Sequence, residues 1–256
     1  MKVTYLAHSG FEVEYKDSVL IFDYYKGEIP VLRLSERLKE ERKVYVFASH
    51  SHEDHFNPCI LQWAEELEHV MYILSDDIKG NVPDDVSDKS ASNESASNES
   101  VSGRNITYVS PNHTYKIGGL SVRTLRSTDK GVAFLVHLED KVIYHAGDLN
   151  WWHWKEESDV WNEFMRRKYP YEIGKLKEER IDAAFVPLDP NQEEAFSWGL
   201  DYFMRHTDTQ YVFPMHMWEK YETWERLLEL PEAAEYKEKV MHVRKPGQEF
   251  QVGADE

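Results

Sequence analysis

The feature that most constrains this chain is the stretch 44–55, in which an apolar strand leads directly into a histidine-rich loop. Val44–Ala48 is continuously apolar, and the following loop carries three imidazoles and a carboxylate within six residues: His50, His52, Asp54 and His55. So many metal-binding side chains in so short a loop are costly to place in a fold unless they bind something. From composition alone, a His-x-His-x-Asp-His match arises in about one in a thousand chains of this length. The loop therefore predicts a metal site.

The spacing within the loop suggests how two metal ions could share it. His50, His52 and Asp54 are two residues apart, so an extended backbone would send their side chains to one face and His55 to the other. One loop can then serve two ions, with His50 and His52 on one and Asp54 and His55 on the other. The alternative is a polar surface turn that binds nothing.

Together with three other segments, this loop resembles the signature of the metallo-β-lactamase superfamily. Those segments occur in the expected order: His8-Ser-Gly-Phe11, Tyr144-His-Ala-Gly-Asp148 and Pro214-Met-His216. The first of them, and the strand that ends at Asp23, resemble the opening of the branch that includes ascorbate-6-phosphate lactonase. The resemblance implies an α/β fold, a four-layer αββα sandwich of two mixed β-sheets flanked by helices. It also implies a metal site at one edge between the sheets, and mostly hydrolytic chemistry.

By this resemblance, the metal ligands would be His50, His52, Asp54, His55, Asp148 and His216. Asp148 would bridge two metals or bind the only one, and Gly147 before it lets the backbone come close to that position. Asp23 would orient the ligands and fix a histidine tautomer. Taken alone, Asp148 could equally be an acidic turn residue, and His216 a core histidine packed among its apolar neighbours.

At one position the chain departs from the superfamily's pattern. Members usually supply a third histidine to the first metal from the end of the strand near residue 126, but this chain reads Leu125-Arg126-Ser127-Thr128-Asp129 there. Arginine stays charged and offers no lone pair to a metal. His50 and His52 therefore lack their expected partner.

The sequence leaves three explanations open. The missing partner could be one of three residues: Asp129, His8 or His153. Alternatively, only the second site is fully occupied, the one formed by Asp54, His55, Asp148 and His216. Finally, Arg126 could contact an anionic substrate group, replacing charge that a second metal would supply, although an Arg126 turned to solvent fits the sequence at least as well.

Four large rings directly follow the bridging aspartate, in Trp151-Trp152-His153-Trp154. Indoles so close to a ligand could wall a substrate pocket, because rings supply apolar area with few rotatable bonds. Trp152 and His153 are therefore candidate substrate contacts. A hydrophobic seam beneath the helix that follows is the competing interpretation.

Composition limits the class of protein. A content of 41% hydrophobic and 13% aromatic residues indicates a globular chain, and no run reaches the roughly 18 apolar residues of a membrane span. The start of the sequence has no secretory apolar core, and the single cysteine, Cys59, suits a reducing compartment. We therefore expect a cytoplasmic protein.

The net charge limits the possible binding partners. The net charge of −17, from 30 basic and 47 acidic residues, repels nucleic acid and anionic membranes. It does not exclude a small anionic substrate, because dications would dominate the local potential. Nothing in the sequence indicates the oligomeric state.

Periodicity and turn chemistry divide the chain into short elements within one predicted domain, 1–256. We expect three strands in the first 25 residues, a helix at 31–42, and a helix that starts at Asn57-Pro58 and runs to about 69. Four strands are expected between 106 and 145, then mostly helical segments at 155–180, 192–206 and 221–239, with strands between them. The first of these segments is expected to be interrupted near Pro170. Residues 84–103 contain Ser-Ala-Ser-Asn-Glu twice and almost nothing apolar. They predict an exposed low-complexity insertion, with a lid over the site as the alternative.

These features predict a hydrolase that uses a metal-activated hydroxide on a small ester, lactone or phosphoester. One or two divalent ions are expected, with zinc favoured by the imidazoles and manganese or iron also compatible. Asp54 would pass a proton to the leaving group. Two alternatives remain: a nuclease or phosphodiesterase of the same fold, which the acidic surface disfavours, and a metal-binding or ligand-sensing protein without turnover, suggested by the missing third histidine.

Overall fold

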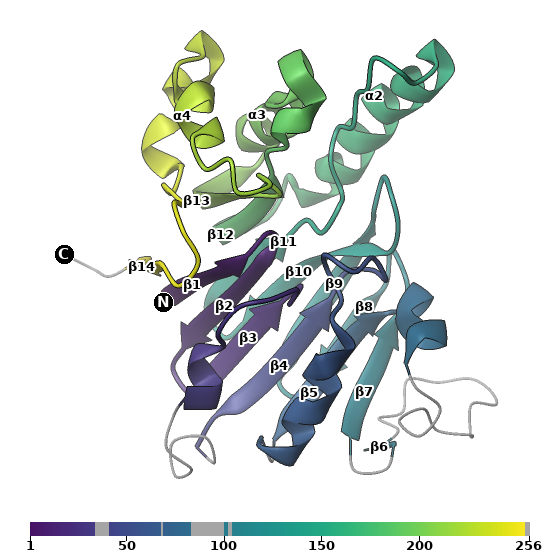
Figure 1. Cartoon of the computed structure of the whole chain (residues 1–256), viewed down its shortest axis with the longest axis vertical. Helices are drawn as coiled ribbons and strands as arrows, with labels where there is room; N and C mark the ends of the chain where they lie inside the picture. Colours follow the sequence, from purple (N-terminus) through teal and green to yellow (C-terminus); the bar gives the residue numbers. More distant parts are fainter. Residues whose placement is uncertain (34–40, 68, 83–99, 102–103, 254–256) are drawn as a thin grey trace.

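The computed structural model of the chain describes residues 1–33, 41–67, 69–82, 100–101 and 104–253 (Figure 1). Most of the predicted insertion at 84–103 lies outside the described residues, and so does most of the helix predicted at 31–42. Within the described part, no helix is both long enough and apolar enough to span a membrane.

Within the described residues, the first sheet has eight strands in the order β14-β1-β2-β3-β4-β5-β7-β6. Their bounds are β1 Lys2–Ala7, β2 Gly10–Tyr15, β3 Ser18–Phe22, β4 Lys43–Ala48, β5 Val70–Ser75, β6 Ser100–Val101, β7 Arg104–Val109 and β14 Glu249–Gln251. Strands β3, β4, β5 and β7 are parallel neighbours, and the other pairs are antiparallel. Parallel strands are normally covered on both faces, which explains why β4 is apolar throughout.

The second sheet has six strands in the order β13-β12-β11-β10-β9-β8, counted over the same residues. These are β8 Thr114–Ile117, β9 Leu120–Arg126, β10 Val132–Leu138, β11 Lys141–His145, β12 Arg180–Pro187 and β13 Asp208–Met215. Strands β8 to β11 form an antiparallel meander, and β11, β12 and β13 are parallel. Both sheets are therefore mixed, as the resemblance to the superfamily implied.

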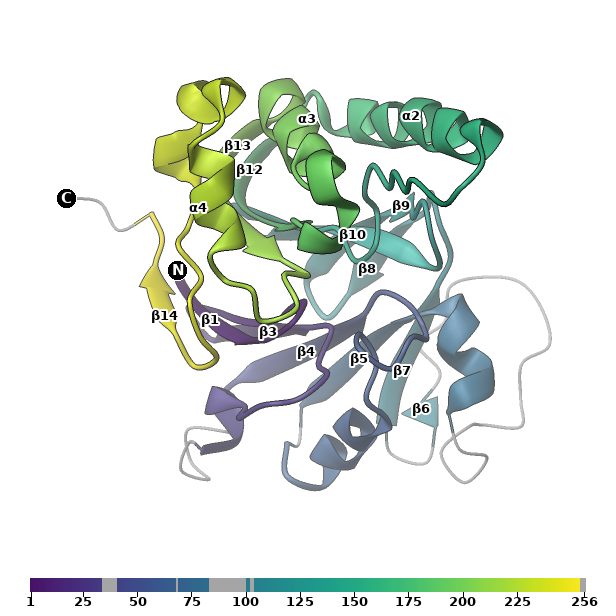
Figure 2. The ribbon, with the colours of Figure 1, turned by 45° about the horizontal axis from the view of Figure 1, so that its top comes forward.

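Helical segments cover the outer face of each sheet (Figure 2). Over the six-stranded sheet lie α2 Asp159–Ile173, α3 Trp198–His206 and α4 Thr223–Leu228, with the short 3₁₀ segments η4 Gly174–Leu176, η5 Pro190–Ala195, η6 Pro231–Glu235 and η7 Lys237–Lys239 nearby. The eight-stranded sheet is covered by η1 Pro30–Arg33, η2 Pro58–Glu65 and η3 Asp76–Asn81. The predicted four-layer αββα architecture is confirmed, with fewer and shorter helices than expected.

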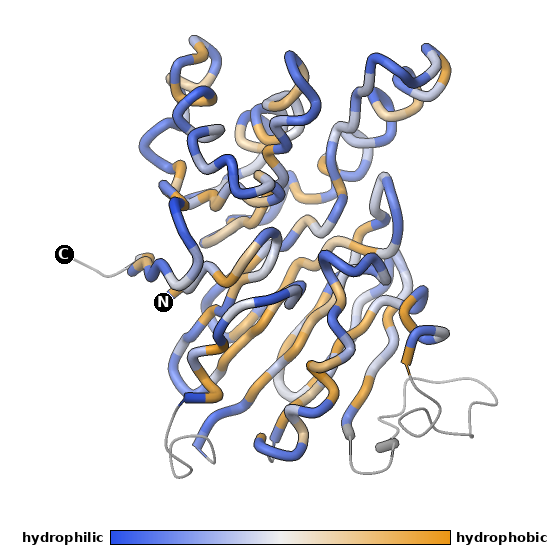
Figure 3. Tube along the Cα trace, in the orientation of Figure 1, coloured by the Kyte–Doolittle hydropathy of each residue, from blue (hydrophilic) through white to orange (hydrophobic). Residues whose placement is uncertain are grey.

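Aromatic side chains hold the two sheets face to face. Phe22 stacks on Phe47 within the first sheet, with ring centroids 4.6 Å apart, and Phe47 meets Phe134 of the second sheet edge-on at 5.2 Å. All three rings are fully buried, and each buried ring removes roughly 150–250 Å² of surface from water. Apolar residues accordingly follow the strands through the middle of the molecule in Figure 3. This packing fixes the edge of the sandwich on which the strand ends meet.

Several local predictions need correction. The helix at Asn57-Pro58 begins as predicted, with the Asn57 side chain accepting a hydrogen bond from the backbone N–H of Cys59, but it is a 3₁₀ segment that ends at Glu65. Pro170 does not interrupt the long helix, because α2 continues through it to Ile173. The strand β8 was not predicted, because its alternating polar residues face solvent. Residues 51–55 form bends and turns rather than the extended segment assumed for the histidine loop.

One buried carboxyl group lies within the first sheet, away from the histidine loop. Glu12 on β2 is fully buried and accepts a hydrogen bond from the backbone N–H of Val31, while its other oxygen has no partner among the described residues. Burial raises the pKa of this carboxyl from 4.5 to about 7. The folded protein therefore holds a proton here at pH values where the unfolded chain has released it.

This proton makes stability depend on pH. Because the folded pKa is the higher one, the stabilisation is complete below about pH 4.5 and is lost as the pH rises through about 7. Glu12→Gln should remove this dependence, so the variant should gain on the order of 2 kcal/mol over the wild type between these limits. Urea unfolding of both metal-free proteins at several pH values measures this difference. Parallel pH profiles for the two proteins would contradict the assignment.

Candidate metal centre

The candidate site lies where strands of both sheets end at one edge of the sandwich. Each polar side chain follows a strand: His8 after β1, Asp23 after β3, the loop 49–55 after β4, Asp129 after β9, Asp148 after β11, Asp189 after β12 and His216 after β13. Segments up to about 200 residues apart in sequence thus meet because the sheet topology brings their ends together. Within the described residues, the side chains form two groups suited to a metal ion.

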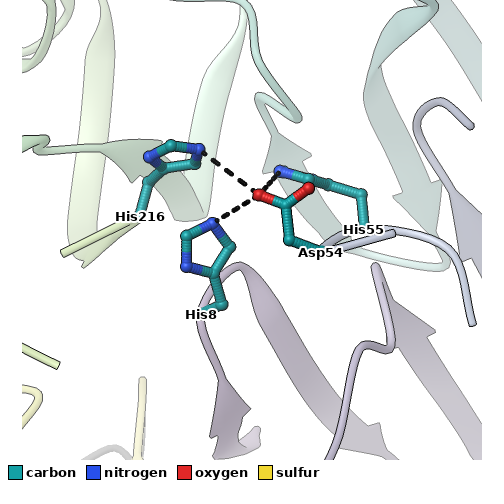
Figure 4. Close-up of side chains that lie close together, drawn as sticks. All are labelled: His8, Asp54, His55 and His216. Atoms are coloured by element: carbon teal, nitrogen blue, oxygen red, sulfur yellow. Dashed lines mark ion pairs between the residues drawn. The ribbon is translucent and has the colours of Figure 1, made fainter. Parts of the chain in front are cut away.

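The first group is built from the ends of β1, β4 and β13. It consists of His8, Asp54, His55 and His216, whose ligand atoms all lie within 4.8 Å of one another. Figure 4 shows the three imidazoles pointing at one oxygen of Asp54. That oxygen, Oδ2, is 3.1 Å from His8 Nε2, 3.8 Å from His55 Nε2 and 4.0 Å from His216 Nε2. We refer to this group as the inner cluster, because its imidazoles are almost completely buried.

The second group lies beside it, nearer to solvent. It consists of His50, His52, Asp129 and Asp148, with the same limit of 4.8 Å between ligand atoms. His52 and Asp129 have 40% and 45% of their side chains exposed, and their closest atoms are 3.6 Å apart. We refer to this group as the outer cluster. Asp129 lies beside His50 and His52, at the place where the superfamily usually has a third imidazole. His8, another candidate for that place, belongs to the inner cluster instead.

The carboxylate of Asp148 connects the two clusters. Its Oδ1 lies 3.2 Å from His55 Nε2 and 3.6 Å from His216 Nε2, whereas its Oδ2 lies 3.4 Å from His50 Nε2. One oxygen therefore faces each group. This is the arrangement required of a carboxylate that bridges two cations.

Several buried polar atoms of the clusters lack a hydrogen bond, which indicates whether these residues fit a metal ion. His8 Nε2, His55 Nε2 and Asp148 Oδ1 are all buried, and none makes a hydrogen bond within the described chain. Buried polar atoms without partners are costly, and such atoms normally face a ligand, an ion or water. Imidazole and carboxylate donors at these distances suit zinc, manganese or iron. The residues therefore fit one or two divalent cations.

A buried carboxylate behind the loop aims the histidines. Asp23 accepts hydrogen bonds from the backbone N–H of Ser49 at 2.7 Å and from the Ser49 hydroxyl at 2.6 Å, and its Oδ2 lies 2.7 Å from His55 Nδ1. The Ser49 hydroxyl oxygen is 2.9 Å from His50 Nδ1. Because the Nδ1 atoms are engaged here, the Nε2 atoms of both imidazoles point into the clusters. Asp23 thus touches a histidine of the inner cluster and, through Ser49, one of the outer cluster.

His216 has an equivalent partner that the sequence analysis missed. Asp189, just after β12, lies 3.1 Å from His216 Nδ1 and also accepts a hydrogen bond from the Trp218 indole at 3.2 Å. Its position after a strand that ends at the same sheet edge could have marked it as a candidate. His145 was missed as well: it is buried behind Asp23, with its Nε2 2.8 Å from the carbonyl oxygen of Ser9.

Electrostatics favour the metal-binding forms of His8, His50 and Asp148, whereas Asp148 and Asp23 outweigh burial and raise the pKa of His55 well above its usual value. Burial lowers the pKa of His50 to about 4 and also lowers the pKa of His8, so both imidazoles are neutral near pH 7. Burial alone would raise the pKa of Asp148, but His55 and His216 outweigh it and hold that pKa well below its usual range. Neutral imidazoles and ionised carboxylates are the ligand forms.

Three residues of the site also have a strained backbone. His8, Asp23 and His216 have φ angles of 51°, 42° and 62°, in the left-handed region that non-glycine residues rarely adopt. Gly131 has a φ of 65°, and a Cβ there would lie 2.7 Å from His50 Cβ and collide with the Ser49 carbonyl oxygen. Such strain persists where the surrounding structure enforces it, commonly at functional sites.

The remaining candidates from the sequence fall outside the two clusters. Arg126 ends β9 as an exposed residue, and its backbone N–H donates to Glu172. His153 packs against Trp198 with ring centroids 4.8 Å apart. Trp152 is buried beside the clusters, and its indole donates to the Asp148 carbonyl oxygen at 3.0 Å. Trp151, by contrast, packs against Trp198, so this tryptophan run both borders the site and forms a seam under α3.

A two-sheet αββα sandwich with histidines and aspartates gathered at one sheet edge defines a metallo-β-lactamase-type protein. Residues 2–159 match a family described as the beta-lactamase superfamily domain. This match covers more than half of the chain, so the chain belongs to that family. The finer resemblance to the lactonase branch stays a prediction.

Individual relatives are more distant. A protein named UPF0173 metal-dependent hydrolase from Cereibacter sphaeroides is 26% identical over 151 residues, which are 59% of this chain and 64% of the relative. The alignment thus spans less than two thirds of that relative's length.

Among solved structures, similarity extends over almost the whole chain at low sequence identity. Igni18, a metallo hydrolase from Ignicoccus hospitalis, superposes with a TM-score of 0.55 at 18% identity, covering 98% of both chains. YhfI from Bacillus subtilis gives 0.57 at 14% identity, covering 98% of this chain and 99% of that one. CmlA, a diiron β-hydroxylase from Streptomyces venezuelae, gives 0.52 at 11% identity over 93% of this chain and 49% of its own. These similarities establish the fold.

The contacts of Asp23 predict that it controls metal affinity without binding metal itself. Asp23→Asn keeps the size of the side chain but weakens the alignment of His55 and Ser49, so metal affinity should fall about 10- to 100-fold. Competition with a chromophoric chelator measures the change. Asp208→Asn, at an exposed position outside the site, is the matched control and should bind metal like the wild type. Equal affinities for both variants would argue against this role.

The difference between the clusters predicts a stepwise loss of metal. The outer cluster is more exposed and depends on Asp129, so Asp129→Ala should lower the content from two ions per chain to one. Asp129→His restores a donor of the type used by the superfamily and should keep two. Elemental analysis after dialysis against a weak chelator gives both counts. An Asp129→Ala variant that still retains two ions would show that Asp129 is not a ligand.

Proposed function

We propose that this protein is a metal-dependent hydrolase acting on a small ester, lactone or phosphoester. The observation that carries the proposal is the convergence of buried imidazole and carboxylate atoms from both sheets around Asp54 and Asp148, of which His8 Nε2, His55 Nε2 and Asp148 Oδ1 make no hydrogen bond among the described residues. Divalent cations bound there would lower the pKa of coordinated water and polarise the oxygen of the bond under attack. The name of the Cereibacter relative supports the same class of reaction.

The residues of the chain divide the remaining work. Asp148 faces both clusters and would hold the cations at a fixed separation, while Asp23 and Asp189 keep the imidazoles oriented. Asp54 lines the open side of the site with 27% of its side chain exposed. Its Oδ2 faces the imidazoles, which leaves Oδ1 to accept a proton and pass it to the leaving group. In this proposal, Asp54 therefore both binds a metal ion and carries a proton to the leaving group.

Zinc is the first metal to test, because imidazoles dominate the inner cluster. The outer cluster has two carboxylates and two imidazoles, a donor set that also suits manganese or iron. CmlA shows that a protein with this fold can hold two irons. Elemental analysis of protein purified without chelators decides the identity.

The sensor alternative loses its main argument. It was based on the missing third ligand for His50 and His52, and Asp129 supplies a carboxylate at that place.

For the binding partners of the protein, we propose a small-molecule substrate and no nucleic acid, on the basis of the strong negative charge. A cytoplasmic location, inferred from the single cysteine, belongs to the same proposal.

Removing two ligands tests the hydrolase directly. His55→Ala with Asp148→Ala should abolish both metal binding and hydrolysis, because His55 belongs to the inner cluster and Asp148 faces both clusters. His137→Ala, at a half-buried histidine of β10 outside the site, should retain metal and activity. Metal content and turnover of chromogenic esters and phosphodiesters are measured on the same preparations. A double variant that remains loaded with metal and active would overturn the proposal.

A further inference from the structure

The space in front of the clusters has walls of two kinds. A cleft of about 370 Å³ opens onto the site, a volume suited to a small organic molecule. One wall is formed by the metal-ligand residues and their supports, among them His52, Asp54, Asp129, Asp148, Asp189 and His216. Apart from the polar Thr128 and Asn191, the other lining residues are aromatic or apolar: Trp152, Trp154, Trp161, Met165 and Trp218. We refer to these five residues as the indole wall.

Hydrogen bonds hold several of these indoles in fixed positions. The Trp152 N–H donates to the Asp148 carbonyl oxygen, and the Trp218 N–H donates to Asp189. The backbone of Trp154 is held by the side chain of Asn162, which accepts from its N–H and donates to its carbonyl oxygen. Rings that are already positioned lose little entropy when a ligand packs against them.

The indole wall is continuous with the metal centre. The rings of Trp152 and Trp154 are nearly parallel, with centroids 5.9 Å apart and an interplanar angle of 10°. Trp152 also lies edge-on to His216, at 5.6 Å. A group attached directly to the bond under attack would therefore touch these rings.

The cleft offers no fixed cation to a substrate. Of the residues that line it in the described part of the chain, none is a lysine or an arginine, and its acidic residues are Asp54, Asp129, Asp148 and Asp189. An anionic group placed away from the metals would lose its hydration and face carboxylates. Arg126, the one side chain that suggested an anionic substrate, does not line this cleft.

We infer that the substrate carries an uncharged aromatic ring next to the bond that is cleaved, and that this ring packs against the indole wall. The inference rests on the proposed function, since it assumes that the reacting group binds at the metal centre. Trp161, in the first turn of α2, is half-buried, lines the cleft and belongs to neither metal cluster, which makes it the specificity residue in this inference. Offset or edge-on ring contacts of this kind are worth about 0.5–1.5 kcal/mol each.

Hydroxamic acids test the cleft without requiring turnover. Their head group chelates the metal centre, so the substituent is placed in the cleft. With metal-loaded protein, benzohydroxamic acid should bind about tenfold more tightly than acetohydroxamic acid, and about tenfold more tightly than 4-carboxybenzohydroxamic acid. Quenching of tryptophan fluorescence gives the three dissociation constants.

Two substitutions of Trp161 and one control locate the effect. Trp161→Ala should remove most of the preference for the ring, and Trp161→Lys should tighten binding of the carboxylated probe by adding a cation. Phe164→Ala changes an exposed ring on the same helix that does not line the cleft, and should bind all three probes like the wild type. Metal content is measured for each variant, so that lost binding is not confused with lost metal.

The outcomes separate this inference from the proposed function. Equal binding of the three probes by wild-type protein, or tightest binding of the carboxylated one, would overturn the inference even if esters are hydrolysed. A ring preference that depends on Trp161 in a protein with no hydrolytic activity would support the cleft assignment and count against the hydrolase. Failure of all three probes to bind metal-loaded protein would also overturn the inference, whereas the proposed hydrolase is tested separately by the metal content and turnover of the His55 and Asp148 double variant.

Discussion

The site depends first on one buried carboxylate. Asp23 is fully buried at the end of β3, yet it accepts two hydrogen bonds from Ser49 and lies against His55. Burial alone would raise its pKa, but His145 and His55 lower that pKa below the usual value, so the group remains charged. An ionised carboxylate in so dry a position is tolerated only because these partners compensate its lost hydration. That compensation fixes the loop after β4, and with it histidines of both clusters.

The two sheets supply what a single loop cannot. The loop 50–55 contributes to both clusters, but His216, Asp148 and Asp129 come from the second sheet, and His8 comes from the turn after β1. Their separation is set by the aromatic packing between the sheets, where Phe47 meets Phe134. A slip between the sheets would move Asp148 away from His55 or His50. Core packing and metal binding are therefore coupled.

The asymmetry between the clusters has a functional meaning. The inner cluster is buried, rich in imidazole and supported by Asp23 and Asp189, whereas the outer cluster is half open and contains Asp129. A carboxylate in place of an imidazole reduces the local positive charge and makes the donor set harder. The cleft in front of them adds carboxylates and indoles but no cation among the described residues. Both features support the uncharged substrate that we propose.

The sequence by itself predicted the sandwich and proposed most of the site residues, because four motifs in the expected order resemble the metallo-β-lactamase superfamily and the histidine loop follows a strand that must be buried. The apolar run at 44–48 predicts a covered parallel strand, and the histidines and aspartates after it are too dense to be incidental. The sequence could not identify which of Asp129, His8 and His153 is the third ligand beside His50 and His52, because spacing along the chain does not show which strand ends become neighbours. Asp189 escaped notice because a lone aspartate before proline looks like a turn. Only the tertiary structure decided these points, because the register between two sheets, set by side-chain packing over long sequence separations, determines which polar groups meet.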